Sequence, residues 1–185
     1  MAKNTDKQFD DVIEKCRSVF ISKARDYGTS WRIFRLPSIT DQIFIKAKRI
    51  RTLDETGINK IGESQESEYI GIINYCIMAI IQSNLNKDAP EDIPVNDLEP
   101  IYDKIVADTK ALMNEKNHDY GEAWRDMRMT SFSDMLLVRL KRIKQIESND
   151  GETQVSEGIE ANYQDMINYA IFALIKLNEN NENLS

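Results

Sequence analysis

A row of acidic side chains near the C-terminus is the clearest candidate for metal chemistry. Glu157, Glu160 and Asp165 lie in the stretch EGIEANYQDMINYA, where Gln164 and Asn168 continue the polar spacing. At helical spacing these side chains fall on or beside one face. Their oxygens suit Mg²⁺, which is often completed by substrate phosphates and water, and one carboxylate could orient an attacking water. We predict catalytic and metal-binding roles for Glu157, Glu160 and Asp165; the alternative is a stripe that faces solvent.

A second set of candidates belongs to the motif K-x-x-D-Y-G-x-x-W-R, which occurs twice. Lys and Arg can bind phosphate oxygens, Arg through two parallel hydrogen bonds, and Tyr and Trp offer flat faces on which a base can stack. The structural alternative is a corner in which Asp caps a helix, Trp fills the core and Arg pairs with Asp. The predicted nucleotide-binding residues are Lys23, Asp26, Tyr27, Trp31 and Arg32, and Lys116, Asp119, Tyr120, Trp124 and Arg125.

Further candidates come from a basic helix and from a pair of asparagines. Asp134 and Arg142 are eight residues apart and fall on one side of a helix, and Arg49 is the counterpart of Arg142. Arginines that face a cleft would suit a triphosphate, whereas a solvated charged face is the alternative. Asn74 and Asn168 each interrupt an apolar run, and a buried amide must find partners. We therefore expect a polar pocket between helices and include Asn168 in the nucleotide site.

These motifs recur because the chain contains an internal duplication. KARDYGTSWRIFRLPSITD begins at Lys23 and KNHDYGEAWRDMRMTSFSD begins at Lys116, so the offset is 116 − 23 = 93 residues. After a one-residue insertion, an offset of 94 continues the correspondence, and Asn74 becomes Asn168. Gly71 stands where the second copy has Asp165. The C-terminal copy is therefore the one expected to hold a full metal site.

Each copy is expected to supply three helices, since apolar residues follow i, i+3, i+4, i+7 spacing. Ser38 and Ser131 are predicted N-caps, and Gly28 and Gly121 are predicted to end the first helix of each copy in the αL conformation. The expected helices span about 8–25, 38–51 and 63–84, then 101–117, 131–144 and 157–178. We predict an all-α fold of two tandem three-helix repeats, 1–85 and 101–185, packed as a pseudo-twofold bundle with one shared core. The proline-rich acidic stretch 86–100 would be the linker.

The amino-acid composition limits the classes of molecule that the protein is expected to bind. The net charge of −7 and the pI near 4.9 disfavour nonspecific binding to nucleic acid, although a small nucleotide in a local pocket is still allowed. Cys16 and Cys76 lie among apolar neighbours and are expected to be reduced core thiols. The N-terminus has no apolar segment typical of a secretory signal, and no apolar run is long enough to span a bilayer. A cytoplasmic protein with no membrane partner is expected; a homo-oligomer is left open.

The doubled K-x-x-DYG-x-x-W, the S-x-x-D helix with its KRI segment and the E-x-x-E-x-x-x-x-D-x-x-NYA helix resemble the nucleotide-modification-associated domain 1 family of phages and bacteria. That resemblance implies a role near nucleotide or DNA-base modification. More distantly, the acidic helices are similar to those of the MazG-like all-α nucleoside triphosphate pyrophosphohydrolases. This second likeness implies Mg²⁺-dependent hydrolysis of a nucleoside triphosphate to monophosphate and pyrophosphate. The alternatives are a non-enzymatic nucleotide-binding or interaction module, or a purely structural pseudo-dimer.

Overall fold

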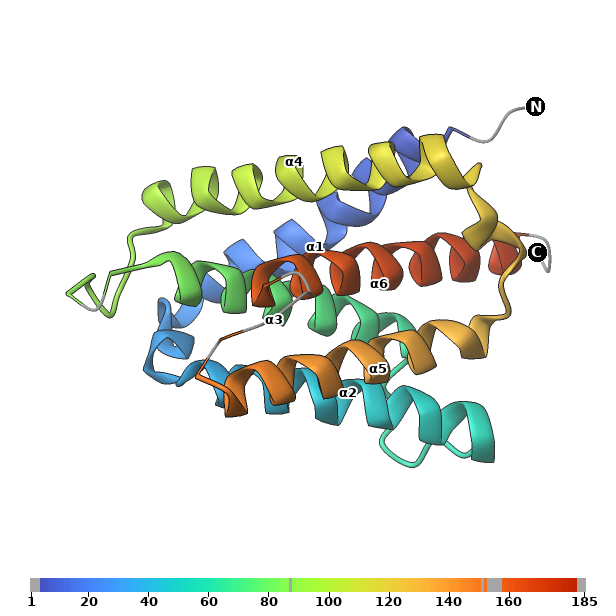
Figure 1. Ribbon diagram of the computed structural model, residues 1–185, viewed down its shortest axis with the longest axis horizontal. Coiled ribbons are helices and arrows are strands. Elements are labelled where there is room, and N and C mark those ends of the chain that lie inside the picture. The colour runs from blue at the N-terminus through green and yellow to red at the C-terminus, as the bar shows by residue number, and fades with distance from the viewer. Residues whose placement is uncertain (1–3, 87, 151, 153–157, 183–185) are drawn as a thin grey trace.

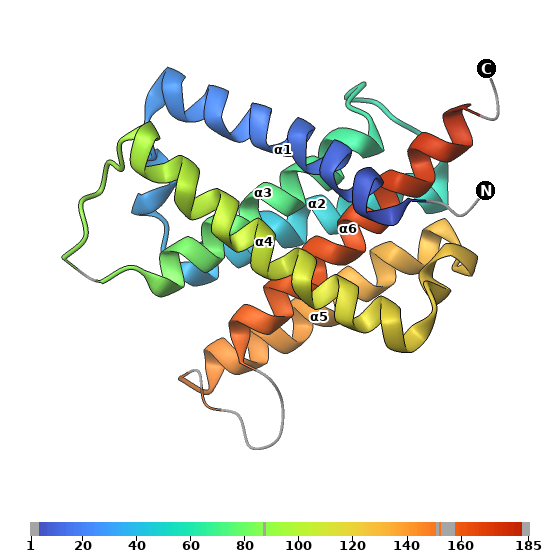
Figure 2. The same cartoon turned by 90° about the horizontal axis from the view of Figure 1, so that it is seen from above.

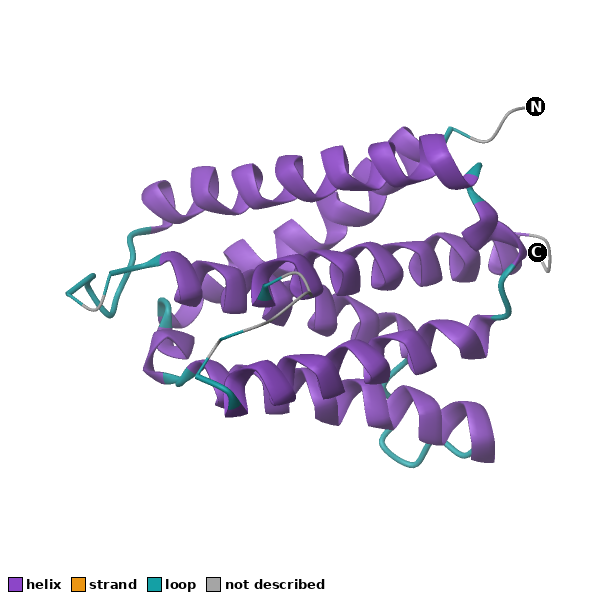
Figure 3. Ribbon diagram, in the orientation of Figure 1, coloured by secondary structure: helices purple, strands orange, loops and turns teal. Residues whose placement is uncertain are grey.

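The structure is a computed structural model that describes residues 4–86, 88–150, 152 and 158–182. Within these residues the regular structure is helical and no strand occurs, which confirms the all-α class (Figure 3). The long helices are α1 (Thr5–Tyr27), α2 (Leu36–Thr56), α3 (Gln65–Asn84), α4 (Val95–Tyr120), α5 (Met129–Ser148) and α6 (Ile159–Glu182). Two short 3₁₀ helices, η1 (Ser30–Ile33) and η2 (Ala123–Asp126), follow α1 and α4. None of the helices in the described part is long and apolar enough to cross a membrane.

The helices form three layers, and each layer takes one helix from each repeat. The pair α3 and α6 forms the middle layer, with α2 and α5 on one side and α1 and α4 on the other (Figure 1). Seen from above, α4 and α1 lie over α6 and α3, and the described ends of the chain lie at the same end of the molecule (Figure 2). The two middle helices therefore contact helices of both repeats.

Reciprocal contacts between the repeats reveal the pseudo-twofold axis. A residue of the first copy meets a residue of the second, and their two counterparts, each displaced by 93 positions, meet in the same way. The reciprocal contacts are Asp41–Lys144 (2.7 Å) with Arg51–Asp134 (3.5 Å), and Thr40–Glu147 (2.7 Å) with Asp54–Ser133 (3.2 Å). The repeats therefore pack like the subunits of a dimer fused into one chain.

One hydrophobic core runs through both repeats. Its largest fully buried side chains come from each half, and they include Phe9, Tyr69, Tyr102, Phe132 and Tyr163. A repeat of about 80 residues would bury too little apolar surface by itself to be more than marginally stable. Since each half covers the core of the other, the fold depends on the contact between the repeats.

Several helix ends differ from the sequence prediction. The N-caps of α2 and α5 are Arg35 and Arg128, not Ser38 and Ser131. Pro37 lies in the first turn of α2, where its missing N–H and fixed φ are tolerated, so the helix starts earlier than the serine. Gly121 takes the predicted αL conformation, but Gly28 has a φ of 67° with a ψ of −155°.

The linker is shorter than predicted. α4 begins at Val95, not near position 101, with Pro94 as its N-cap residue. Pro100 lies inside the helix, where it removes one backbone hydrogen bond. The burial of Leu98 and Tyr102, which lie on either side of Pro100 and are fully buried in the core, offsets the free energy lost with this hydrogen bond.

Candidate functional site

A pocket of about 560 Å³ opens in the N-terminal repeat, between α1, α2 and α3. Ligand pockets usually fall between about 300 and 1,000 Å³, so this one can hold a small molecule. Its lining combines basic, acidic, aromatic and small residues from all three helices and from η1. The residues used below are Lys23, Tyr27, Trp31, Phe34, Lys46, Glu63, Glu68, Gly71, Asn74, Tyr75 and Met78.

Two lysines supply the positive charge of the pocket. Lys23 comes from α1 and is exposed, and no ion pair ties it to another described residue. Lys46 comes from α2, with its Nζ 3.5 Å from Glu68 Oε2 and 6.0 Å from the centre of the Tyr75 ring. Its aliphatic stem lies across Gly71: a Cβ at Gly71 would lie 2.7 Å from Lys46 Cε. Gly71 therefore leaves room for the lysine to cross the helix.

Aromatic side chains form another wall of the pocket. Tyr27 is 59% exposed, whereas Trp31 is buried and packs against Phe20, with ring centres 6.4 Å apart. Tyr75 and Met78 from α3 are partly buried, and burial raises the pKa of the Tyr75 hydroxyl. These flat and polarisable surfaces suit a planar ring.

The deepest carboxylate of the pocket is already paired. Glu68 is only 3% exposed, and Arg49 Nη1 donates to its Oε1 at 2.5 Å. The same guanidinium donates to the Glu63 side chain at 3.3 Å and to Asn59 at 3.2 Å. Arg49, a predicted phosphate ligand, thus joins α2 to α3 and to the loop before α3.

The tryptophans of the repeated motif occupy the core, as the corner alternative describes. Trp31 and Trp124 are both buried. Trp124 stacks on Phe172, with ring centres 4.2 Å apart and planes 5° from parallel, and the Arg125 guanidinium lies 4.3 Å from the centre of the Trp124 ring. Only Trp31 also lines the pocket.

The arginines of the motif are also bound to protein groups. Arg32 donates to the Gln82 side chain and to the Ala89 carbonyl. Arg125 donates to Gln8 and Thr5 of α1 and to the carboxylates of Glu122 and Glu179. These contacts fix the chain around η1 and η2.

The two interior asparagines hold helices together. Asn74 donates to the Cys16 carbonyl at 3.0 Å and accepts from the Tyr102 hydroxyl at 3.1 Å. Asn168 donates to the Thr109 carbonyl at 3.2 Å. Asn74 also lines the pocket, whereas Asn168, the asparagine predicted for the nucleotide site, does not.

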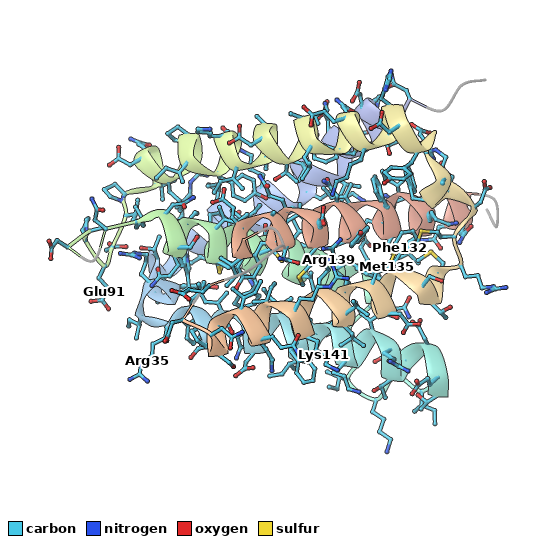
Figure 4. The ribbon with its side chains drawn as sticks, viewed as in Figure 1. Arg35, Glu91, Phe132, Met135, Arg139 and Lys141 are labelled. Carbon is cyan, nitrogen blue, oxygen red and sulfur yellow. The ribbon has the colours of Figure 1, made fainter. Side chains whose placement is uncertain are left out.

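In the C-terminal repeat, Asp165 lies between two cations. Its side chain is 3% exposed; Lys116 Nζ lies 2.5 Å from Oδ1, and Arg139 Nη2 lies 2.8 Å from Oδ2. Figure 4 shows Arg139 in the space between α5 and α6. Lys116, a predicted phosphate ligand, therefore contacts a carboxylate of its own chain.

The structure describes two of the three predicted metal ligands, Glu160 and Asp165. Glu157 lies outside the described residues, and Glu160 is partly buried on the side of α6 near Lys104, whose pKa it helps to raise. Among the residues that the structure describes, no group of three His, Cys, Asp or Glu side chains is arranged to hold a metal ion. The magnesium site therefore stays a sequence prediction.

The remaining predicted residues lie outside the lining of the N-terminal pocket. Asp26, Tyr120 and Arg142 are exposed, Asp119 lies 3.1 Å from His118, and Asp134 pairs with α2. The pocket does unite Lys23, Tyr27 and Trp31.

Sequence reasoning gave no ligand role to Glu68 or Tyr75, nor did it expect an open pocket at Gly71. The available signal was the replacement of Gly71 by Asp165 between the copies, beside two positions that are basic in both: Lys23 with Lys116, and Lys46 with Arg139.

Comparison with known proteins agrees with the duplication. The model of the family described as nucleotide modification associated domain 1 matches the chain twice, over residues 23–83 and 116–177. No match was found among curated proteins or among solved structures, and the distant likeness to MazG-like hydrolases gains no support. The two matches cover most of the chain, and the first includes the pocket-lining residues from Lys23 onward. The chain therefore belongs to the nucleotide modification associated domain 1 family.

Proposed function

We propose that this protein binds a nucleotide in the N-terminal pocket. The base would lie against Tyr27, Trp31 and Tyr75, and the phosphates would face Lys23 and Lys46. The observation that carries the proposal is that one pocket of suitable volume combines an aromatic wall with two basic side chains. The family description agrees with a nucleotide as the ligand.

A catalytic version of this proposal adds Mg²⁺-dependent hydrolysis. Water would attack the α-phosphorus of a nucleoside triphosphate, the bond from that phosphorus to the bridging oxygen would break, and pyrophosphate would leave. Acidic residues that recur between the copies support this version: Glu63, which lines the pocket, and Glu66 correspond in sequence to Glu157 and Glu160.

Binding without hydrolysis is the alternative, and the pairing of the buried acids favours it. Glu68 is bound by Arg49 and Lys46, and Asp165 by Lys116 and Arg139. A carboxylate that is already paired with two cations is a poor ligand for Mg²⁺ unless those cations move away.

The first test is calorimetric titration with nucleoside mono- and triphosphates, with and without Mg²⁺. Tyr27→Ala is expected to weaken binding by about fivefold to a hundredfold, because base stacking contributes about 1–3 kcal/mol. Tyr120→Ala is the matched control, since Tyr120 is the counterpart in the other repeat and is also exposed; its affinity should be unchanged. Absence of binding under every condition would refute the proposed function.

The second test separates the two versions. Release of pyrophosphate is measured with Mg²⁺ for the unmodified protein and for Glu63→Gln with Glu66→Gln, the acidic pair of the repeat that holds the pocket. Hydrolysis that the double variant loses would support the catalytic version. Tight nucleotide binding without release of pyrophosphate would contradict the catalytic version and support binding without hydrolysis.

A further inference from the structure

We infer that the C-terminal repeat carries its own substitute for the ligand, so that the chain binds one anionic ligand, at the N-terminal repeat. The Asp165 carboxylate takes the place that the phosphate takes above Gly71 in the other copy. This inference rests on the proposed function and adds the position of the phosphate and the number of sites.

Three positions correspond between the two repeats. Lys116 is the counterpart of Lys23, at an offset of 93, and Arg139 is the counterpart of Lys46 at the same offset. Asp165 is the counterpart of Gly71, at an offset of 94. In the C-terminal repeat both basic side chains reach Asp165, and in the N-terminal repeat Lys46 crosses Gly71 while Lys23 lines the same pocket.

In the C-terminal repeat the turn of α6 that holds Asp165 provides the anion. Asp165 accepts from Lys116 at 2.5 Å and pairs with Arg139 at 2.8 Å, so both of its oxygens are engaged. Because the carboxylate is buried, both contacts are only weakly screened by water. The arrangement is a complete two-cation clamp around one anion.

In the N-terminal repeat the same turn provides no side chain. Lys23 has no ion pair among the described residues, and Lys46 reaches Glu68 only at 3.5 Å. Glu68 is satisfied mainly by Arg49, at 2.5 Å. The two lysines therefore retain capacity for an external anion; Lys46, which lies across Gly71, would swing toward that anion within the pocket that both residues line.

A second difference concerns the aromatic wall. In the C-terminal repeat, Phe172 stacks on Trp124. The counterpart of Phe172 is Met78, a flexible side chain that lines the open pocket, as Trp31 does. At these two positions the closed copy supplies a planar ring and an anion, whereas the open copy has Met78 and Gly71.

The spacing of these two substitutes indicates the class of ligand. Phe172 and Asp165 are seven residues apart on α6, which corresponds to about 10 Å along the helix axis. A ligand that replaces both would carry a planar ring and an anionic group at the two ends of an extended molecule. A nucleotide has this form, with the base as the ring and the phosphate as the anion.

The decisive variant is Gly71→Asp, which copies the closed repeat into the open one. Its Cβ would meet only the far end of the flexible Lys46 side chain, which can move aside. The new carboxylate would pair with Lys23 and Lys46 and exclude the phosphate. Gly71→Asn is the matched control, because it has the same size and no charge.

Both variants are titrated with inorganic pyrophosphate and with ATP, GTP, CTP and dTTP. We expect one site per chain in the unmodified protein, an affinity at least tenfold weaker in Gly71→Asp, and a loss in Gly71→Asn that is several-fold smaller. Equal losses in the two variants would mean that volume, not charge, closes the site, and would overturn the inference. Two equivalent sites per chain in the unmodified protein would overturn it as well.

The outcomes separate this inference from the proposed function. If nucleotides bind the unmodified protein and Gly71→Asp equally well, the proposed function stands and the inference fails. If pyrophosphate binds and Gly71→Asp abolishes that binding, while no nucleotide binds, the anion site stands and the nucleotide proposal fails. If neither pyrophosphate nor any nucleotide binds, both fail.

Discussion

A single hydroxyl distinguishes the two interior asparagines, and its removal should weaken the fold measurably. Tyr102 donates to Asn74 Oδ1 at 3.1 Å. The counterpart of Tyr102, 93 positions earlier, is Phe9, which has no hydroxyl. Asn168 Oδ1 is accordingly buried without a hydrogen-bond partner among the described residues. The pseudo-twofold axis therefore makes Tyr102→Phe and Phe9→Tyr a matched pair.

The structure sets the sign and size of each effect. Tyr102→Phe leaves Asn74 Oδ1 buried and unpaired, which should cost about 1–3 kcal/mol of unfolding free energy. Phe9→Tyr places a hydroxyl toward Asn168 Oδ1 and should gain about 0.5–1.5 kcal/mol, the net value of one hydrogen bond. Both positions are fully buried, so solvent cannot replace the missing partner.

Urea unfolding with linear extrapolation measures both changes, and an unchanged m-value shows that the denatured state is unaffected. The double variant, which exchanges the two residues, tests whether the effects are independent. The reasoning is refuted if Tyr102→Phe is neutral. It is also refuted if Phe9→Tyr costs as much as Tyr102→Phe, since the second amide would then need no donor.

Three further outcomes are expected. Gly28→Ala should destabilise more than Gly121→Ala in thermal unfolding: both glycines have positive φ, but only at Gly28 would a Cβ meet a side chain, Asp92 Oδ1 at 2.6 Å. Burial raises the pKa of Glu147 in the folded state, so the cost of ionising it is present above that pKa and absent below its ordinary value. Glu147→Gln should therefore stabilise the protein at pH 7, by an amount that shrinks in urea titrations as the pH falls through the pKa. Burial raises the pKa of the Cys16 thiol to about 12, so the native protein should react slowly with thiol reagents at pH 8 and rapidly once unfolded.

The helices and the duplication could be predicted because both depend on patterns of residues that are close together in the sequence or repeat along it. Apolar periodicity identifies a helix from its own residues, and two copies of one pattern reinforce each other. The residues at which the helices begin and end were harder to predict, since they depend on the conformation of the adjacent residues. Serine is a favourable N-cap residue, and Ser38 and Ser131 were therefore predicted to begin these helices. The residues just before each serine are already helical, and in the first copy they include Pro37, which is well tolerated in a first helical turn.

The site was harder to predict because its chemistry depends on partners from other helices. The carboxylate of Asp165, absent from the first copy, was interpreted from its own helix as part of a metal site. The structure pairs it with Lys116 of α4 and Arg139 of α5, contacts that spacing on α6 cannot reveal. The same holds for Gly71, whose meaning depends on Lys46 of α2. The motif arginines likewise join distant segments, as Arg125 does with α1.

The comparison of the two clamps has a consequence for stability. Two cations that converge on a buried turn need an anion, and a covalently attached one is present at every ligand concentration. The C-terminal clamp should therefore be equally stable with and without ligand, whereas the N-terminal clamp should gain RT ln(1 + [L]/Kd) as ligand is added. Gly71→Asp should show part of this gain without ligand, because its carboxylate would relieve the repulsion between Lys23 and Lys46. A melting temperature that rises in Gly71→Asp, and that then no longer responds to pyrophosphate, is the joint signature of an anion supplied by the chain itself.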